Sequence, residues 1–199
     1  MLKLQAESNV PTQFGEFRMM AFSEDDKNWM PHMALIAKDT DLEKPTNVRI
    51  HSECITGEVF NSKKCECGEQ LDSAMKYMQE NGGIILYLRQ EGRNIGIINK
   101  VKAYALQEKG LDTVQANLQL GLPADNRDFS AAIDMLEQIG VKSVNLMTNN
   151  PEKIKFIKDS NIGYNSRIPL QIKSNEASAS YLKTKRDYFG HLLDDENQS

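Results

Sequence analysis

The chain contains no long hydrophobic run and very little cysteine. None of its apolar stretches approaches the roughly 20 residues that a transmembrane helix needs. Its first residues, MLKLQAESNVPTQFGEF, lack the continuous apolar segment of a secretory signal. We therefore expect a cytoplasmic protein with reduced thiols and no membrane partner.

Positive charge is also in short supply. The sequence has 24 Lys and Arg against 28 Asp and Glu, which gives a net charge of −4 and argues against a nucleic-acid partner. A length of 199 residues, 40% of them hydrophobic, suits one compact domain. We expect residues 1–193 to form that domain and residues 194–199, DDENQS, to be a disordered tail.

The hydrophobic pattern changes from strand-like near the start to alternating helix and strand. Period-two alternation and short apolar runs predict strands, and apolar residues at i, i+3, i+4 and i+7 predict helices. The fold class that follows is α/β (α+β mixed), with a mixed sheet flanked by helices and a β-rich N-terminal portion. The predicted strands are 16–22, 32–38, 47–52, 84–88, 143–148 and 167–172, and the predicted helices are 69–83, 98–110, 128–140 and one that follows residue 150.

Capping residues mark the ends of two predicted helices. Asp128 is the predicted N-cap of the helix that ends at Gly140. Asn150 is the predicted N-cap of the next one, with Pro151 at its first position.

All three cysteines lie within fourteen residues of each other, at Cys54, Cys65 and Cys67. An odd number of cysteines is a poor basis for a disulfide framework. Cys65 and Cys67 project to the same side if the backbone there is extended, and Cys67 lies next to a predicted helix N-terminus, which favours its thiolate. Three thiolates suit a catalytic zinc with one position left for water. The alternatives are a structural zinc with His51 as fourth ligand, and buried thiols without a metal.

Three polar segments lie between the predicted elements, and the first follows the buried strand 84–88, where open α/β sheets bind their ligands. LRQEGRNIGIINK, residues 88–100, suits a phosphate, although a solvated charged loop has the same composition. Asp125 and Arg127 are either a general base beside an anion-binding residue or a surface ion pair. Lys153 lies in the first turn of the helix that follows Asn150, where a positive charge interacts unfavourably with the helix dipole. A bound anion would offset this unfavourable interaction, and so would the neighbouring Glu152.

The chain resembles the GTP cyclohydrolase II family, whose members catalyse the first step of riboflavin biosynthesis. The resemblance covers residues 3–193 and is carried by VRIHSECITGEVF, CECGEQL, LRQEGRNIGIINKVKAYALQEKGLDTVQAN, PADNRDF and LMTNNPEKI. It implies that GTP loses C8 of its imidazole ring as formate and also loses pyrophosphate. It further implies Mg²⁺ on the triphosphate and a homodimer.

The same resemblance implies roles for individual residues. Cys54, Cys65 and Cys67 resemble the ligands of one zinc per chain, completed by water. Asp125 resembles the general base, Arg127 the residue that attacks or clamps the α-phosphate, and Tyr104 a residue that completes ring opening. The implied GTP-binding residues are Arg49, Ile50, His51, Ser52, Glu53, Gln70, Glu91, Gly92, Arg93, Thr113, Thr148 and Lys153.

Two further expectations concern charge and specificity at this site. Three thiolates give a zinc site a net charge of −1, which weakens the Lewis acidity of the zinc. Nearby cations must offset this negative charge if the zinc is to activate water. A carboxylate at Glu91 is suited to accept guanine N1–H and N2–H, which would select guanine over adenine.

The sequence departs from the family pattern around the cysteines. Glu58 and Glu66 stand where Asp is usual, and Lys64 stands where Arg is usual. A lysine makes no bidentate phosphate contact, so the departure bears on affinity and rate. The alternative functions are a relative that stops at the formamide product and a catalytically impaired guanine-nucleotide-binding protein.

Overall fold

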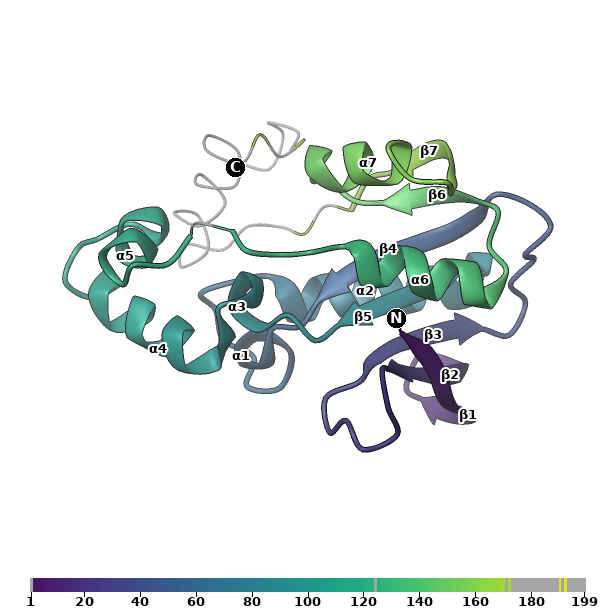
Figure 1. Ribbon diagram of the computed structural model, residues 1–199, viewed down its shortest axis with the longest axis horizontal. Helices are drawn as coiled ribbons and strands as arrows, with labels where there is room; N and C mark the ends of the chain where they lie inside the picture. The colour runs from purple at the N-terminus through teal and green to yellow at the C-terminus, as the bar shows by residue number, and fades with distance from the viewer. Residues whose placement is uncertain (1, 124, 171, 173–189, 191, 193–199) are drawn as a thin grey trace.

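A single seven-stranded sheet organises the part of the chain that the structure describes. The structure is a computed structural model, and it describes residues 2–123, 125–170, 172, 190 and 192 (Figure 1). The strand order is β1-β2-β3-β5-β4-β6-β7. The mixed sheet with its helices confirms the predicted α/β class, whereas the predicted tail lies outside the described residues.

Seven strands and seven helices are described. The strands are β1 (Lys3–Thr12), β2 (Gly15–Ser23), β3 (His32–Ala37), β4 (Thr46–Ser52), β5 (Ile84–Leu88), β6 (Ser143–Met147) and β7 (Gly163–Ile168). The helices are α1 (Ile55–Glu58), α2 (Cys67–Asn81), α3 (Glu91–Asn94), α4 (Gly96–Gln107), α5 (Thr113–Gln119), α6 (Ser130–Ile139) and α7 (Pro151–Lys158). Within the described ranges, no helix combines the length and the apolar character needed to cross a membrane.

The sheet has an antiparallel half and a parallel half. β1, β2, β3 and β5 pair antiparallel in that order. β5, β4, β6 and β7 pair parallel. Parallel strands must be joined by crossovers, so the helices concentrate on this second half.

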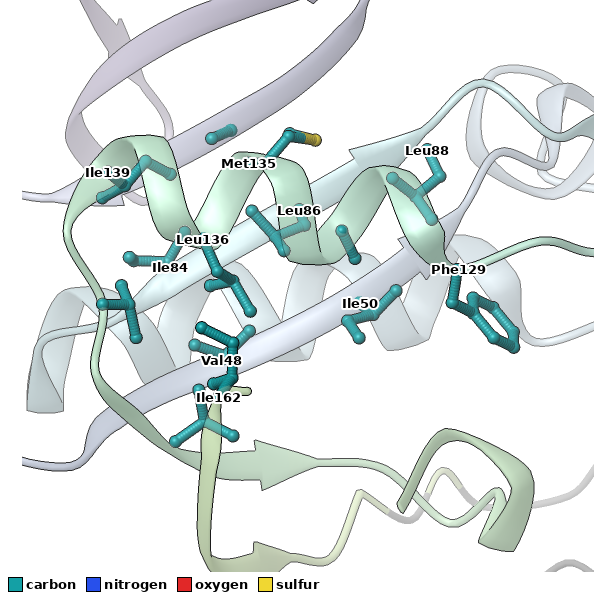
Figure 2. Close-up of a cluster of buried hydrophobic side chains, with 14 of the residues drawn as sticks. Val48, Ile50, Ile84, Leu86, Leu88, Phe129, Met135, Leu136, Ile139 and Ile162 are labelled. Carbon is teal, nitrogen blue, oxygen red and sulfur yellow. The ribbon is translucent and has the colours of Figure 1, made fainter. Parts of the chain in front are cut away.

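The apolar core lies on both faces of the central strands. Leu86 of β5 and Ile50 of β4 meet Met135 and Leu136 of α6 in the larger cluster (Figure 2). On the opposite face, Ile85 packs with residues that include Met78 of α2. The run IILYL is therefore buried on both faces, as its continuous apolar pattern indicates.

The predicted helix ends are largely confirmed. Gly140 ends α6 in the left-handed conformation. The Asn150 side chain accepts the Glu152 N–H at 2.9 Å, and Pro151 opens α7. Asp128 is not the N-cap of α6, because Phe129 holds that position. The Asp128 carboxylate still accepts the Ser130 N–H at 2.9 Å, so it caps the helix from one residue further out.

Several elements differ from the sequence prediction, which named no strand at β1 and no helix at α1 or α3. The last strand was expected at 167–172 but runs over Gly163–Ile168. It is an edge strand with the sequence GYNSRI and no buried residue, so hydrophobic alternation did not mark its start. The short helix α5 was not predicted; its N-terminus is fixed by a capping box between Asp112 and Gln115.

Candidate active site

The carboxyl ends of the parallel strands open onto a cavity of about 380 Å³. β4 ends at Ser52 and is followed by α1, and β5 ends at Leu88 and is followed by α3. This is the edge at which open α/β sheets bind ligands. Ten of the predicted site residues line the cavity: Ser52, Glu53, Cys54, Cys65, Cys67, Gly92, Arg93, Tyr104, Thr113 and Arg127.

The three cysteines meet at this cavity. Their Sγ atoms all lie within 4.8 Å of one another, and the Sγ atoms of Cys54 and Cys65 are 3.5 Å apart. Cys54 is the N-cap of α1, and Cys67 is the first residue of α2. From the sequence we assumed an extended backbone between Cys65 and Cys67. The structure differs, because Glu66 has φ −106° and ψ 14°. The turn into α2 brings the two thiols together instead.

A close approach of α1 and α2 makes this cluster possible. A Cβ on Gly57 would lie 2.7 Å from Cys65 Sγ and 3.4 Å from Cys54 Sγ. A Cβ on Gly68 would lie 2.4 Å from the Gly57 carbonyl oxygen. The shortest distance at each glycine is far inside van der Waals contact. A larger residue at Gly57 would displace the thiols, and one at Gly68 would push the backbone of α1 away from α2.

The three thiols differ in acidity. Hydrogen bonds from Cys65 and Cys67, helped by the Lys100 ammonium, hold the pKa of Cys54 far below its usual range. The hydrogen bond to Cys54 raises the pKa of Cys65, and those to Cys54 and Cys65 raise that of Cys67 well above the usual value. The cluster and the Lys100 ammonium together therefore favour the thiolate most strongly at Cys54.

Glu58 organises the region behind Cys54. Its Oε1 accepts from the Cys54 backbone N–H at 2.8 Å and lies 2.8 Å from His51 Nε2, while its Oε2 accepts from the Tyr87 hydroxyl at 2.5 Å. His51 is thus turned toward Glu58. Across the described ranges, the sulfur cluster gains no histidine or carboxylate as a fourth member. This geometry argues against the structural zinc in which His51 is a ligand.

Lys100 and Glu91 lie on the other side of Cys54. Lys100 Nζ is 3.0 Å from Cys54 Sγ and 2.7 Å from Glu91 Oε1. Burial by itself would lower the pKa of Lys100, but the negative charge on Cys54, together with the Glu91 hydrogen bond, raises it above its usual value. The second Glu91 oxygen accepts the Ile55 N–H at 2.6 Å.

Asp125 and Arg127 form the pair that their spacing suggested. Arg127 Nε donates to Asp125 Oδ1 at 2.9 Å, and its NH2 donates to Oδ2 at 2.5 Å. Burial would raise the pKa of Asp125, but the hydrogen bond and charge of Arg127 outweigh it and lower the pKa below its usual value. The Phe129 ring has two neighbouring cations. The Arg127 guanidinium lies 5.5 Å from the centre of the ring, and Lys153 Nζ lies 5.2 Å from the same centre.

Several predicted site residues are not among those that line the cavity. Arg49 donates to Gln70 Oε1 at 2.9 Å, and burial lowers its pKa to about 10. The Ile50 side chain is in the core, and its carbonyl oxygen accepts from Lys153 Nζ at 2.7 Å. Thr148 is buried and accepts the Asn150 N–H at 3.0 Å.

The three residues that depart from the family pattern, Glu58, Lys64 and Glu66, each contact other side chains. Lys64 Nζ lies 4.6 Å from the centre of the Tyr104 ring and 3.5 Å from Glu108. Buried Glu66 accepts from Gln70 Nε2 at 3.4 Å. Burial raises the pKa of the Tyr104 hydroxyl.

Sequence reasoning did not assign a role to Lys100, Glu58 or Tyr87. Lys100 is 46 positions from Cys54 and Tyr87 is 29 from Glu58, so no local spacing relates them. The one available signal was that a cluster of thiolates needs a neighbouring cation.

Comparison with known proteins identifies relatives over almost the full length. Residues 3–169 match the family GTP cyclohydrolase II. GTP cyclohydrolase-2 of Buchnera aphidicola is 48% identical over 193 residues, 96% of this chain and 99% of that protein. GTP cyclohydrolase-2 of Neisseria meningitidis serogroup A is 50% identical over 194 residues, 97% and 98% of the two chains.

Proposed function

The chain belongs to the GTP cyclohydrolase II family, and we propose that it opens the imidazole ring of GTP. The products are formate, pyrophosphate and 2,5-diamino-6-ribosylamino-4(3H)-pyrimidinone 5′-phosphate, in the first step of riboflavin biosynthesis. The observation that carries the proposal is the convergence of three thiols and Arg127 on one cavity. Metal-assisted hydrolysis and phosphate binding are thereby brought within reach of one nucleotide.

The sulfur cluster fits one zinc ion per chain. A tetrahedral zinc with Zn–S bonds of about 2.3 Å separates its sulfur ligands by about 3.8 Å. The 3.5 Å separation of Cys54 and Cys65, and the limit of 4.8 Å on all three, agree with that spacing. Bound there, the ion supplies Lewis acidity that activates water toward C8 of the base.

Asp125 and Arg127 serve the two hydrolytic steps in this proposal. Asp125 is ionised at neutral pH, because its pKa is lowered, and it takes a proton from the attacking water. While it is paired with Arg127, the Asp125 carboxylate is a weak base. In this proposal the substrate binds Arg127, which separates the pair and makes Asp125 a stronger base. A guanidinium in a protein stays protonated, which supports Arg127 as an α-phosphate clamp rather than a nucleophile.

The remaining residues bind and orient the nucleotide. Arg93 and Thr113 line the cavity and suit the triphosphate with its Mg²⁺. Tyr104 keeps its proton, because its pKa is raised by burial, and donates a hydrogen bond during ring opening. Glu91 retains carboxylate lone pairs for guanine N1–H and N2–H beside those it already uses. The wall on which GTP rests is shaped by Gly92, residues 49–53, Gln70, Thr148 and Lys153.

The assembly we propose is a cytoplasmic homodimer built on one domain, residues 1–193. Exposed apolar side chains on two neighbouring helices support the dimer: Ile98 and Val101 on α4, and Leu118 on α5. Side chains of this kind in one region mark interaction surfaces. Sedimentation at several protein concentrations tests this assembly.

One incubation separates the proposed function from its alternatives. Protein of known zinc content is mixed with GTP and Mg²⁺, and formate, pyrophosphate and product mass are followed together. Equal amounts of formate and pyrophosphate support the full reaction. Pyrophosphate without formate indicates a relative that stops at the formamide, and neither product indicates an impaired nucleotide-binding protein.

A further inference from the structure

The Lys100 ammonium is held in a nearly closed setting between a carboxylate and a sulfur. Its side chain is 12% exposed and that of Glu91 is 10% exposed. Nζ lies 2.7 Å from Glu91 Oε1 and 3.0 Å from Cys54 Sγ. A buried ammonium is costly unless it is paired and hydrogen-bonded, and here it donates to both the Glu91 carboxylate and the Cys54 sulfur.

The surrounding backbone holds this ammonium in place. Glu91 Oε2 accepts the N–H of Ile55, the residue that follows Cys54, so one carboxylate ties α1 to the Lys100 side chain of α4. Gly92 has φ +62°, and a Cβ there would lie 3.3 Å from Lys100 Cβ. The absence of a side chain at Gly92 leaves room for the lysine stem.

A simple ion pair with Glu91 does not account for the contact with sulfur. A divalent ion with three thiolates has a net charge of −1, and a cation at one sulfur offsets it. A hydrogen bond to a ligating sulfur also reduces the electron density that the sulfur donates to the metal. Both effects increase the Lewis acidity of the bound ion.

We infer that Lys100, anchored by Glu91, is a positioning residue that hydrogen-bonds the Cys54 sulfur and tunes the metal held by the three cysteines. This inference rests on the proposed function, because it requires the cysteines to hold a metal. It assigns no contact between Lys100 and the nucleotide. Lys100 also lines the cavity, but in this inference it acts on the reaction through the Cys54 sulfur.

Cobalt substitution tests the inference without relying on turnover. The full-length protein is loaded with Co²⁺, and the sulfur-to-cobalt charge-transfer absorption is recorded for wild type and Lys100→Met. Loss of the hydrogen bond makes the Cys54 sulfur a stronger donor, so we expect the band to move to longer wavelength. Lys100→Arg keeps the cation and the N–H donors and should return the band toward its wild-type position.

Lys102→Met is the matched control, because Lys102 is an exposed lysine on the same helix. Its band should coincide with that of the wild type. The zinc form of Lys100→Met should lose about 10–100-fold in kcat, the range typical for residues that support metal ligands, with little change in KM. If Lys100→Met does not fold, Lys100→Gln is measured instead and should show a smaller shift in the same direction.

The outcomes distinguish this inference from the proposed function. A wild-type cobalt band that is unchanged in Lys100→Met and Lys100→Gln overturns the role of Lys100 and leaves the metal site standing. Absence of any sulfur-to-cobalt band in the wild type overturns the metal site and this inference together.

Discussion

The antiparallel and parallel halves of the sheet bury their strands to different extents. Most residues of β1 are exposed, whereas β4 and β5 contain no exposed residue. The hairpin between β1 and β2 connects neighbouring strands directly, but each parallel connection returns across the sheet through a helix (Figure 1). Those crossovers cover the parallel half and deliver its loops to one edge.

The difference explains where charge can be used for chemistry. The ion pair between Arg18 and Glu7 in the antiparallel half spans 3.9 Å with both side chains about half exposed, and water screens such a pair. Lys100 and Glu91 at the edge of the parallel half are 2.7 Å apart and almost shielded from water. Substitutions at shielded and at exposed positions test this contrast.

The largest effect is expected from Cys54→Ser. The hydroxyl is a poor replacement for a thiolate ligand, so we expect zinc and formate release to be lost together. Zinc is measured by elemental analysis of the purified protein, and circular dichroism verifies that the fold is retained. Full zinc content with normal formate release would show that Cys54 is not a ligand.

The next largest effect concerns stability. Leu86 is fully buried in β5, so Leu86→Ala should reduce the free energy of unfolding by about 2–5 kcal/mol. Leu4→Ala in β1 is the matched control at 40% exposure and should cost well under half as much. Urea unfolding of both variants measures the difference, and equal losses would contradict the contrast between the halves.

A second pair changes arginine to lysine in each half. Arg127→Lys keeps the charge but loses the two-pronged contact with Asp125, and formate and pyrophosphate release should fall by about 100-fold. Arg18→Lys should leave both rates unchanged. Steady-state kinetics on the two variants provides the measurement, and wild-type rates in Arg127→Lys would exclude the clamp.

The smallest effect is a change in pH dependence. The pKa of Asp125 lies below its ordinary value of 3.8 in the folded protein, so its ionised form contributes stability above that pH. The contribution is lost as the pH falls through the folded-state pKa. Asp125→Asn should therefore differ most from wild type at neutral pH and least in acid, in urea unfolding series at several pH values. Asp72→Asn, at an exposed position on α2, is the matched control. A difference that grows in acid would contradict this sign.

Much of the parallel half was predictable from sequence, because its signals are local. The continuous run IILYL, the apolar period of α6 and the Asn150-Pro151 start of α7 each reflect interactions within a few residues. The strand β1 and the short helices α1 and α3 were not predicted, and two further elements, the edge strand β7 and the helix α5, were misjudged or missed. The strand β7 is polar and forms through its pairing with β6. The helix α5 has only seven residues, and its N-terminus depends on a capping box.

The sequence by itself determined the chemistry that this protein carries: three thiols within fourteen residues, and an Asp and an Arg two positions apart. Residues separated by so few positions stay near one another in space, whatever the arrangement of the rest of the chain. Tertiary structure alone decided that Lys100 reaches Cys54 across 46 positions, and that Glu58 joins His51 to Tyr87. Those contacts depend on strand order and helix packing, which arise from the burial of the whole sheet and leave no local pattern in the sequence.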